Sequence, residues 1–252
     1  MSVNCKSPTI QVGRALIKSD VHLYCFKAAT TNVSYNQTVE GIECMHRAPV
    51  LWLFQYRQYY SCLNEQESIW SQSLPGKLAH RFCCSRSCVR QALSNLWNCQ
   101  PQKIPLHAPP AAPPRLAPGW GFVSLSHCHD ATLIGWAPKR LGVDLERVDR
   151  QFNAAALAQR FFPSEECQVL IDLTTEQLRE EVLQRWLSKE AAIKWQCTSL
   201  ATDLQHWICT DNTTITHRKL GYSLQTLHHS YKNWRAKLAL KDTRYTSTLC
   251  LV

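Results

Sequence analysis

The sequence is 252 residues long, 45% hydrophobic and 19% charged, which is typical of a soluble globular protein with one domain or two small ones. No apolar run approaches the length of a membrane span, and no hydrophobic signal region stands at the N-terminus. We therefore expect a cytoplasmic protein with no membrane partner. The formal net charge of +9 implies an anionic partner, but no basic block or recognition motif supports nucleic acid, so we expect none to bind.

The basic excess is concentrated near the C-terminus. After residue 214, only Asp242 opposes the basic residues Arg218, Lys219, Lys232, Arg235, Lys237, Lys241 and Arg244. This distribution suits a nucleotide cofactor together with an acidic protein partner as well as it suits nucleic acid.

The thirteen cysteines are odd in number and show no C-x-x-C spacing. The run His127-Cys128-His129 invites a zinc interpretation, yet a structural zinc site needs four ligands with recognisable spacing. We expect reduced, mostly buried thiols and no zinc.

The first part of the chain divides into an extension, a strand and a helical region. Residues 1–45 lack apolar periodicity, which predicts a loosely ordered extension or an upstream start codon assigned in error. The run Val50–Phe54 predicts a first strand. Residues Leu63–Asn98 are expected to be helical with a break at Pro75-Gly76, and the proline-rich stretch Pro101–Pro118 to be a loop without regular structure.

The second part of the chain alternates strands with helices. Ser164 is expected to cap a helix beginning at Glu165, and Thr174 with Gln177 forms a capping box that opens a long helix. Strands are predicted at Phe122–Ser126, Ala131–Ala137, Leu141–Val148, Gln205–Thr210, Asn233–Lys241 and Ser247–Val252. The pattern gives an α+β protein in two halves that meet near residue 139.

Two short segments carry candidate chemistry. In the strand 141–148, Asp144 and Glu146 share a face because alternate residues of a strand point the same way. In the long helix, Trp186, Glu190 and Lys194 recur every four residues and form one stripe. If strand and helix pack together, three carboxylates and one ammonium converge, as a Mg²⁺ and phosphate site requires. Each segment alone is also typical of a solvated sheet face or a salt-bridged helix surface.

These segments resemble the signature pair of the Sfp-type 4′-phosphopantetheinyl transferases. The resemblance is carried by five motifs in order, over roughly residues 50–250. They are the basic helix Arg81–Arg90, the Ser-His strand Val123–Cys128, the stretch G-V-D-L-E at 142–146, the stretch R-F-F-P-S-E-E at 160–166, and R-W-L-S-K-E-A-A-I-K-W at 185–195.

The resemblance implies two similar α/β halves in a pseudo-twofold arrangement with the active site in the cleft between them. Residues 46–139 would bind coenzyme A and residues 140–252 would hold the metal. The implied reaction is the Mg²⁺-dependent transfer of 4′-phosphopantetheine from coenzyme A to a serine of an apo acyl or peptidyl carrier protein, releasing 3′,5′-ADP. We expect a monomer.

The resemblance also implies roles for individual residues. Glu190 would take the serine proton, directly or through a metal-bound water, and Lys194 would stabilise charge on the departing nucleotide. The metal ligands would be Asp144, Glu146 and Glu190, and the coenzyme A contacts Arg81, Arg86, Arg115, Ser126, His127, Asp144 and Lys194. We expect Arg90 to be structural and both Trp186 and Trp195 to belong to the core; His127 is either a ligand or a satisfied core histidine.

The sequence departs from the family at one point. The family carries Gly-Lys-Pro before the Ser-His strand, whereas this chain has no lysine in residues 111–115, and Arg115 is the candidate replacement. Two other functions use the same residues: a Mg²⁺-dependent phosphohydrolase or nuclease, and a non-catalytic module that binds coenzyme A or a carrier protein.

Overall fold

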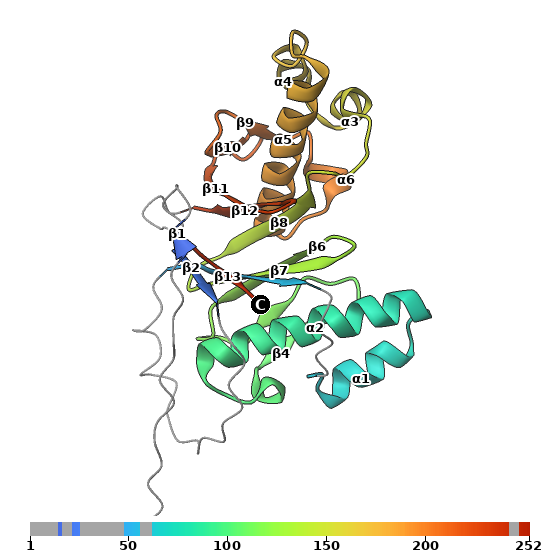
Figure 1. Ribbon diagram of the computed structural model, residues 1–252, viewed down its shortest axis with the longest axis vertical. Helices are drawn as coiled ribbons and strands as arrows, with labels where there is room; N and C mark the ends of the chain where they lie inside the picture. Colours follow the sequence, from blue (N-terminus) through green and yellow to red (C-terminus); the bar gives the residue numbers. More distant parts are fainter. Residues whose placement is uncertain (1–14, 17–21, 26–47, 56–61, 242–246) are drawn as a thin grey trace, which may run out of the picture.

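The computed structural model describes residues 48–55, 62–241 and 247–252, together with the backbone of two short strands at 15–16 and 22–25. The prediction for residues 1–45 falls largely outside these ranges and stays a prediction. Two large sheets and two long helices make up most of the described part of the molecule (Figure 1).

The first sheet has six strands in the order β1-β2-β13-β3-β7-β6. Their bounds are Ala15–Leu16 (β1), His22–Cys25 (β2), Val50–Gln55 (β3), Phe122–His127 (β6), Ala131–Ala137 (β7) and Thr248–Leu251 (β13). Strands β3, β7 and β6 are antiparallel neighbours, whereas β13 runs parallel to β3 and β2. The last described strand of residues 140–252 therefore belongs to the sheet of the first half.

The second sheet has five antiparallel strands in the order β8-β12-β11-β10-β9. Their bounds are Leu141–Arg147 (β8), Trp207–Cys209 (β9), Thr214–His217 (β10), Ser223–Tyr231 (β11) and Trp234–Leu240 (β12). Strands β10 and β11 were not predicted, because Thr, Ser, His and Gln occupy most of their positions and hide the apolar alternation. Both lie inside the sheet, where pairing on two sides compensates for weak propensity.

Six α-helices are described: Glu65–Gln72 (α1), Gly76–Trp97 (α2), Ala154–Phe161 (α3), Ser164–Gln168 (α4), Thr175–Gln196 (α5) and Leu200–Asp203 (α6). The predicted break at Pro75-Gly76 and the Thr174–Gln177 capping box are confirmed. The predicted cap at Ser164 is wrong, since Pro163 is the N-cap and Ser164 is the first helical residue. Among these helices, none combines the length and apolar character that a bilayer crossing demands.

The stretch 101–118 is more regular than predicted. It contains a 3₁₀ turn at Pro101–Lys103 and a small ladder of β4 (Leu106–His107) with β5 (Arg115–Leu116). Between the prolines, the two-residue segments β4 and β5 keep backbone N–H and C=O groups that can pair with each other.

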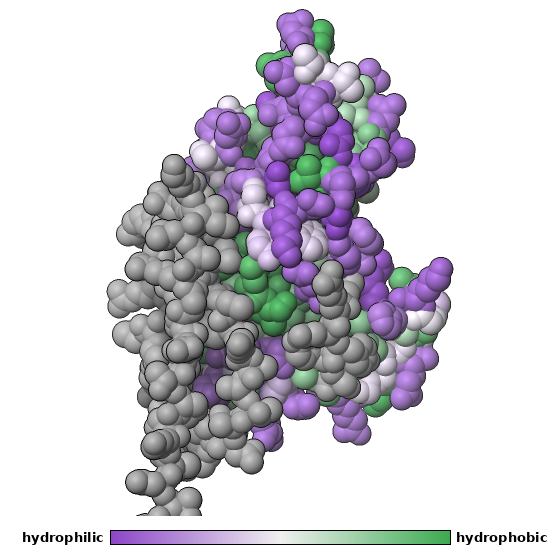
Figure 2. All heavy atoms as spheres, viewed as in Figure 1, coloured by the Kyte–Doolittle hydropathy of each residue, from purple (hydrophilic) through white to green (hydrophobic). Residues whose placement is uncertain are grey.

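The chain forms four layers, with each sheet between a long helix and the other sheet. In β3, Trp52 and Phe54 pack with α2, whereas Leu51 and Leu53 face the second sheet. Leu141, Val143 and Leu145 of β8 complete the core between the sheets, and α5 covers the opposite face of the second sheet. Figure 2, in the orientation of Figure 1, shows a largely hydrophilic surface in the upper part of the molecule, with hydrophobic residues gathered near its middle. Because alternate residues of a strand point to opposite faces, these apolar residues of β8 are buried between the sheets and the polar residues that alternate with them lie on the other face.

Candidate active site

The structure brings the three predicted carboxylates together. Asp144 and Glu146 lie on the face of β8 that α5 covers, and Glu190 projects from α5. Among the described residues, these three are the group able to hold a metal ion, with one ligand oxygen from each within 4.8 Å of the others. Asp144 is only 2% exposed, so the cluster is sunk between strand and helix.

The close approach of α5 to β8 depends on Gly142. A Cβ at this position would stand 1.9 Å from the carbonyl oxygen of Ala191 and 2.4 Å from the amide nitrogen of Trp195. Both contacts are with helix backbone, which cannot rotate away. A residue without a side chain is therefore required for the helix to bring Glu190 to the strand.

Lys194 joins the carboxylates to the Ser-His strand. Its Nζ lies 2.6 Å from Asp144 Oδ1 and 2.8 Å from Ser126 Oγ, and the Ser126 hydroxyl donates to the same Oδ1 at 2.7 Å. Glu190 is 3.6 Å from the ammonium. Burial lowers the pKa of Lys194, but Asp144 and Glu190 raise it by more, so the pKa stands above its ordinary value and the ammonium stays charged.

The carboxylates perturb one another as expected for a cation site. Burial, and then the charge of Asp144, raises the pKa of Glu190 to about 8, with Lys194 opposing the shift. Burial and Asp144 also raise the pKa of Glu146. A divalent cation would remove this mutual repulsion.

The second oxygen of Asp144 provides an independent test of the metal interpretation. Its Oδ2 is buried and accepts no hydrogen bond within the part of the chain that the structure describes. A buried carboxylate oxygen without a partner is costly unless something else satisfies it. Three hard oxygen donors and this open lone pair fit Mg²⁺.

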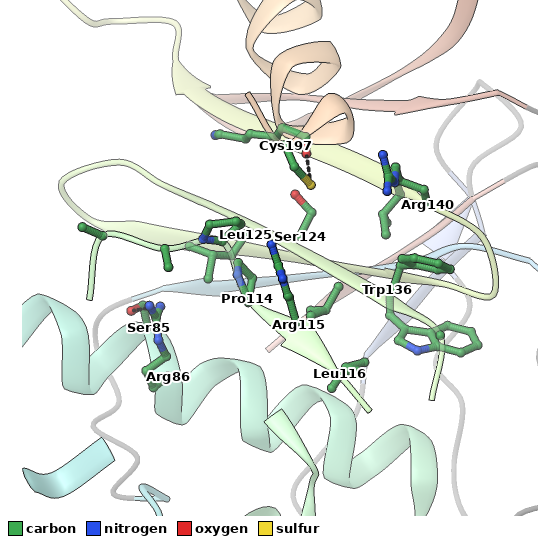
Figure 3. Close-up of a pocket in the computed structure, with 18 of the residues that line it drawn as sticks. Ser85, Arg86, Pro114, Arg115, Leu116, Ser124, Leu125, Trp136, Arg140 and Cys197 are labelled. Atoms are coloured by element: carbon green, nitrogen blue, oxygen red, sulfur yellow. Dashed lines mark hydrogen bonds between the residues drawn. The ribbon is translucent and has the colours of Figure 1, made fainter. Parts of the chain in front are cut away.

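A cavity of about 1300 Å³ opens beside Lys194 and is lined by residues from both halves of the chain. Figure 3 shows Arg86 and Arg140 on opposite sides of it, with Arg115 between them. Five of the predicted contacts line the cavity: Arg81, Arg86, Arg115, His127 and Lys194. Ser126 is held instead by Asp144 and Lys194.

Arg86 and His127 differ in how much of each side chain is available to contact a ligand in the cavity. Arg86 Nε donates to the carbonyl oxygen of Ala108 at 2.8 Å, so part of the guanidinium is used to fix the proline-rich stretch. His127 is exposed and is not a core histidine. Partial burial and the neighbouring cations Arg81 and Lys194 lower its pKa, which favours the neutral imidazole.

Arg140 and Cys197 also line the cavity but were not predicted as site residues. The guanidinium carbon of Arg140 stands 5.7 Å from the ring centroid of Trp195. Its position two residues before the G-V-D-L-E motif was the available signal. Cys197 is exposed at the left-handed end of α5.

Several other motif residues are structural. Arg90 is fully buried and makes a bidentate pair with Glu67 at 2.6 and 3.1 Å, as its structural assignment requires. Glu166 pairs with the buried Lys189 at 2.5 Å and fastens α4 to α5. Trp186 is 9% exposed and belongs to the core around α5, as predicted. Buried ion pairs of this kind fix orientation more than they add stability.

The thiols are less buried than expected. No disulfide joins the ten cysteines in the described ranges, but only Cys88 and Cys250 are fully buried. The prediction of reduced, mostly buried thiols is wrong in its second part, because several cysteines lie at the edges of the packed layers.

The part of the chain that contains the carboxylate cluster also matches known proteins in sequence. Residues 140–250 match the family model described as the 4′-phosphopantetheinyl transferase superfamily. A Synechocystis sp. protein provisionally named a 4′-phosphopantetheinyl transferase is 30% identical over 118 residues, which cover 45% of this chain and 48% of that protein. The chain thus matches about half the length of this relative. The matched segment of the family model contains all three carboxylates and Lys194.

Proposed function

We propose that this protein is an Sfp-type 4′-phosphopantetheinyl transferase that modifies a serine of an apo acyl or peptidyl carrier protein. The observation that carries the proposal is the position of Lys194, which pairs with Asp144 and Glu190 of the carboxylate cluster and also lines a large cavity that contains several arginines. A pyrophosphate donor needs this pairing of cation-binding carboxylates with positive charge. The match of residues 140–250 to the superfamily supports the same function.

Asp144, Glu146 and Glu190 would hold Mg²⁺, which supplies Lewis-acid polarisation of phosphate oxygens when bound. The unpartnered Oδ2 of Asp144 supports this assignment. Coenzyme A would occupy the cavity, with its phosphates near Lys194, His127 and Arg115.

The chain's own residues would then move the proton and neutralise charge. With the negative charge of the cluster offset by a bound cation, Glu190 would be ionised. Its carboxylate oxygen would then take the proton of the carrier serine as the serine oxygen attacks phosphorus. The ammonium of Lys194 would stabilise negative charge on the departing 3′,5′-ADP. Ser126, which donates to Asp144 and lies 2.8 Å from Lys194, keeps that lysine in place.

The architecture supports two corresponding halves. Helices α2 and α5 are both 22 residues long, and each covers one face of one large sheet. We propose that the halves 46–139 and 140–252 are related by a pseudo-twofold axis, with coenzyme A in the cleft. The protein would act as a cytoplasmic monomer.

The test is to incubate the protein with coenzyme A, Mg²⁺ and apo acyl or apo peptidyl carrier proteins, and to weigh the intact carrier. We expect the carrier to gain one phosphopantetheine and 3′,5′-ADP to appear in equal amount. Glu190→Gln is the control and should leave the carrier unmodified. Nucleotide release without a change in carrier mass would favour a phosphohydrolase. Binding of coenzyme A without either product would favour a binding module.

A further inference from the structure

One basic residue that no motif assigns contacts the carboxylate cluster. Arg150 pairs with Glu146 through Nη1 and Oε1, and the two side chains are 38% and 16% exposed. Lys194 pairs with Asp144 at 2.6 Å. Each β8 carboxylate of the cluster therefore already has a cationic partner from the chain itself.

The turn after β8 places Arg150 at this point. The amide of Arg150 donates to the carbonyl oxygen of Arg147, and Arg179 from α5 donates to the carbonyl oxygen of Arg150 at 2.9 Å. The Arg150 guanidinium also lies 5.6 Å from the ring centroid of Phe152. The backbone is thus anchored while the side chain remains partly exposed and able to move.

Arg147 cannot take over this contact. Its guanidinium is bound by Asp130 on one side and Asp149 on the other. A further cavity of about 420 Å³ is lined by Glu146, Arg147, Asp149 and Arg150, with Cys128 and His129. This space adjoins the Arg150 side chain and leaves room for it away from Glu146.

We propose that Arg150 is a positioning residue that occupies Glu146 in the metal-free protein and so weakens divalent-cation binding until coenzyme A is present. This inference rests on the proposed metal site. The ammonium of Lys194 and the guanidinium of Arg150 offset the negative charges of Asp144 and Glu146, so the metal-free cluster attracts a doubly charged cation only weakly. The pyrophosphate of the donor would add anionic oxygens, and the cation would then displace the guanidinium from Glu146.

The experiment is a calorimetric titration of the full-length protein with MgCl₂, without and with coenzyme A. We expect Arg150→Gln to bind Mg²⁺ roughly tenfold more tightly than wild type without coenzyme A, because a neighbouring positive charge and a competitor are both removed. The advantage should shrink when coenzyme A is present. Arg150→Lys keeps the charge and should stay closer to wild type.

Arg235→Gln is the matched control. Arg235 lies opposite Glu146 on β12 but donates to the carbonyl oxygens of Lys232 and Trp234. Its removal changes the local charge equally without freeing Glu146, so the gain in Mg²⁺ affinity should be much smaller. Equal gains in both variants would show a general charge effect and overturn the competition.

Two further outcomes separate this inference from the proposed function. Unchanged or weaker Mg²⁺ binding by Arg150→Gln, with normal binding by wild type, overturns the role of Arg150 alone. Weaker binding would show that Arg150 supports Glu146 as a ligand. If wild type binds no Mg²⁺ even with coenzyme A, and Asp144→Asn behaves identically, the metal site itself fails and this inference fails with it.

Discussion

The two carboxylate oxygens of Asp144 differ in their contacts. Oδ1 accepts from Ser126 and Lys194, which ties the first sheet, the second sheet and α5 together at one atom. Oδ2 is buried without a hydrogen-bond partner among the described residues. A single side chain thus assembles the site and leaves one lone pair for a ligand.

Replacing Glu190 by Gln should stabilise the protein while abolishing transfer. The folded-state pKa of Glu190 is raised to about 8 by burial and by Asp144, so its ionisation costs stability as pH rises above its ordinary pKa. Gln removes that cost, and we expect stability at pH 8 to increase by roughly 1–3 kcal/mol. Chemical denaturation measures the gain, and the carrier mass assay measures the loss of activity. A destabilised Glu190→Gln protein would contradict the repulsion argument.

Replacing Arg115 by Ala should weaken coenzyme A binding if this arginine compensates for the missing lysine. Arg115 lines the cavity from β5, and a charge-assisted phosphate contact is worth roughly 1.5–3 kcal/mol, or about ten- to a hundredfold in affinity. The KM for coenzyme A should rise by about that factor, with a smaller effect on the carrier protein.

The exposed Arg160 on α3 does not line this cavity and provides the matched control, Arg160→Ala. Adding Ala112→Lys to Arg115→Ala should recover part of the lost affinity. An unchanged KM for coenzyme A in Arg115→Ala would show that the proline-rich stretch around Arg115 serves only as a connection between β4 and β6.

At the level of elements, the site depends on how closely one helix lies on one strand. Glu190 reaches Asp144 because Gly142 lets the α5 backbone contact β8 directly. The same strand pairs along its full length with β12, so it cannot shift to accommodate a side chain. The geometry of the carboxylate cluster is therefore set by packing of the main chain.

Gly142→Ala should push α5 away from β8 and damage the cluster. Its Cβ would stand 1.9 Å from the Ala191 carbonyl oxygen, and overpacking of this kind costs roughly 1–3 kcal/mol. We expect a lower melting temperature together with weaker Mg²⁺ binding in calorimetry. Gly76→Ala is the control, because nothing lies within 4 Å of its added Cβ. Normal metal binding by Gly142→Ala would show that the ligands do not depend on this contact.

The sequence predicted the carboxylate cluster because two local periodicities, of a strand and of a helix, each expose their polar residues on one face. It did not predict the Arg150–Glu146 contact or the cavity position of Arg140, since both depend on turns whose geometry follows from long-range contacts with α5. Strands β10 and β11 were not predicted because the neighbouring strands supply the stability that their own residues lack.

At the scale of the whole molecule, the two sheets are fastened to each other by polar as well as apolar contacts. His229 of β11 is 4% exposed, and its Nε2 lies 2.7 Å from Ser247 Oγ, just before β13. Burial lowers the pKa of His229 to about 4. The imidazole is thus neutral where the second sheet contacts the last strand of the first.

Acid should weaken this connection. Because the folded-state pKa of His229 lies below that of the unfolded chain, the unfolded chain binds more protons between about pH 6.5 and 4. Stability therefore falls as pH drops through this window. We expect His229→Gln, which can still hydrogen-bond to Ser247, to show a shallower loss of melting temperature between these pH values. Identical slopes for the two proteins would contradict the assignment.

Strand β13 has a consequence for the order in which the protein folds. It lies between β2 and β3 in the first sheet, and it is synthesised roughly 200 residues after β3, a separation that makes sheet closure slow. While the ribosome translates the second half, β3 lacks this neighbour, and the hydrogen-bonding groups that it presents to β13 lack their partners. The nascent first half thus carries an open sheet edge of the kind that chaperones shield. The order of synthesis thus places completion of the first sheet after the strands of the second sheet have been made.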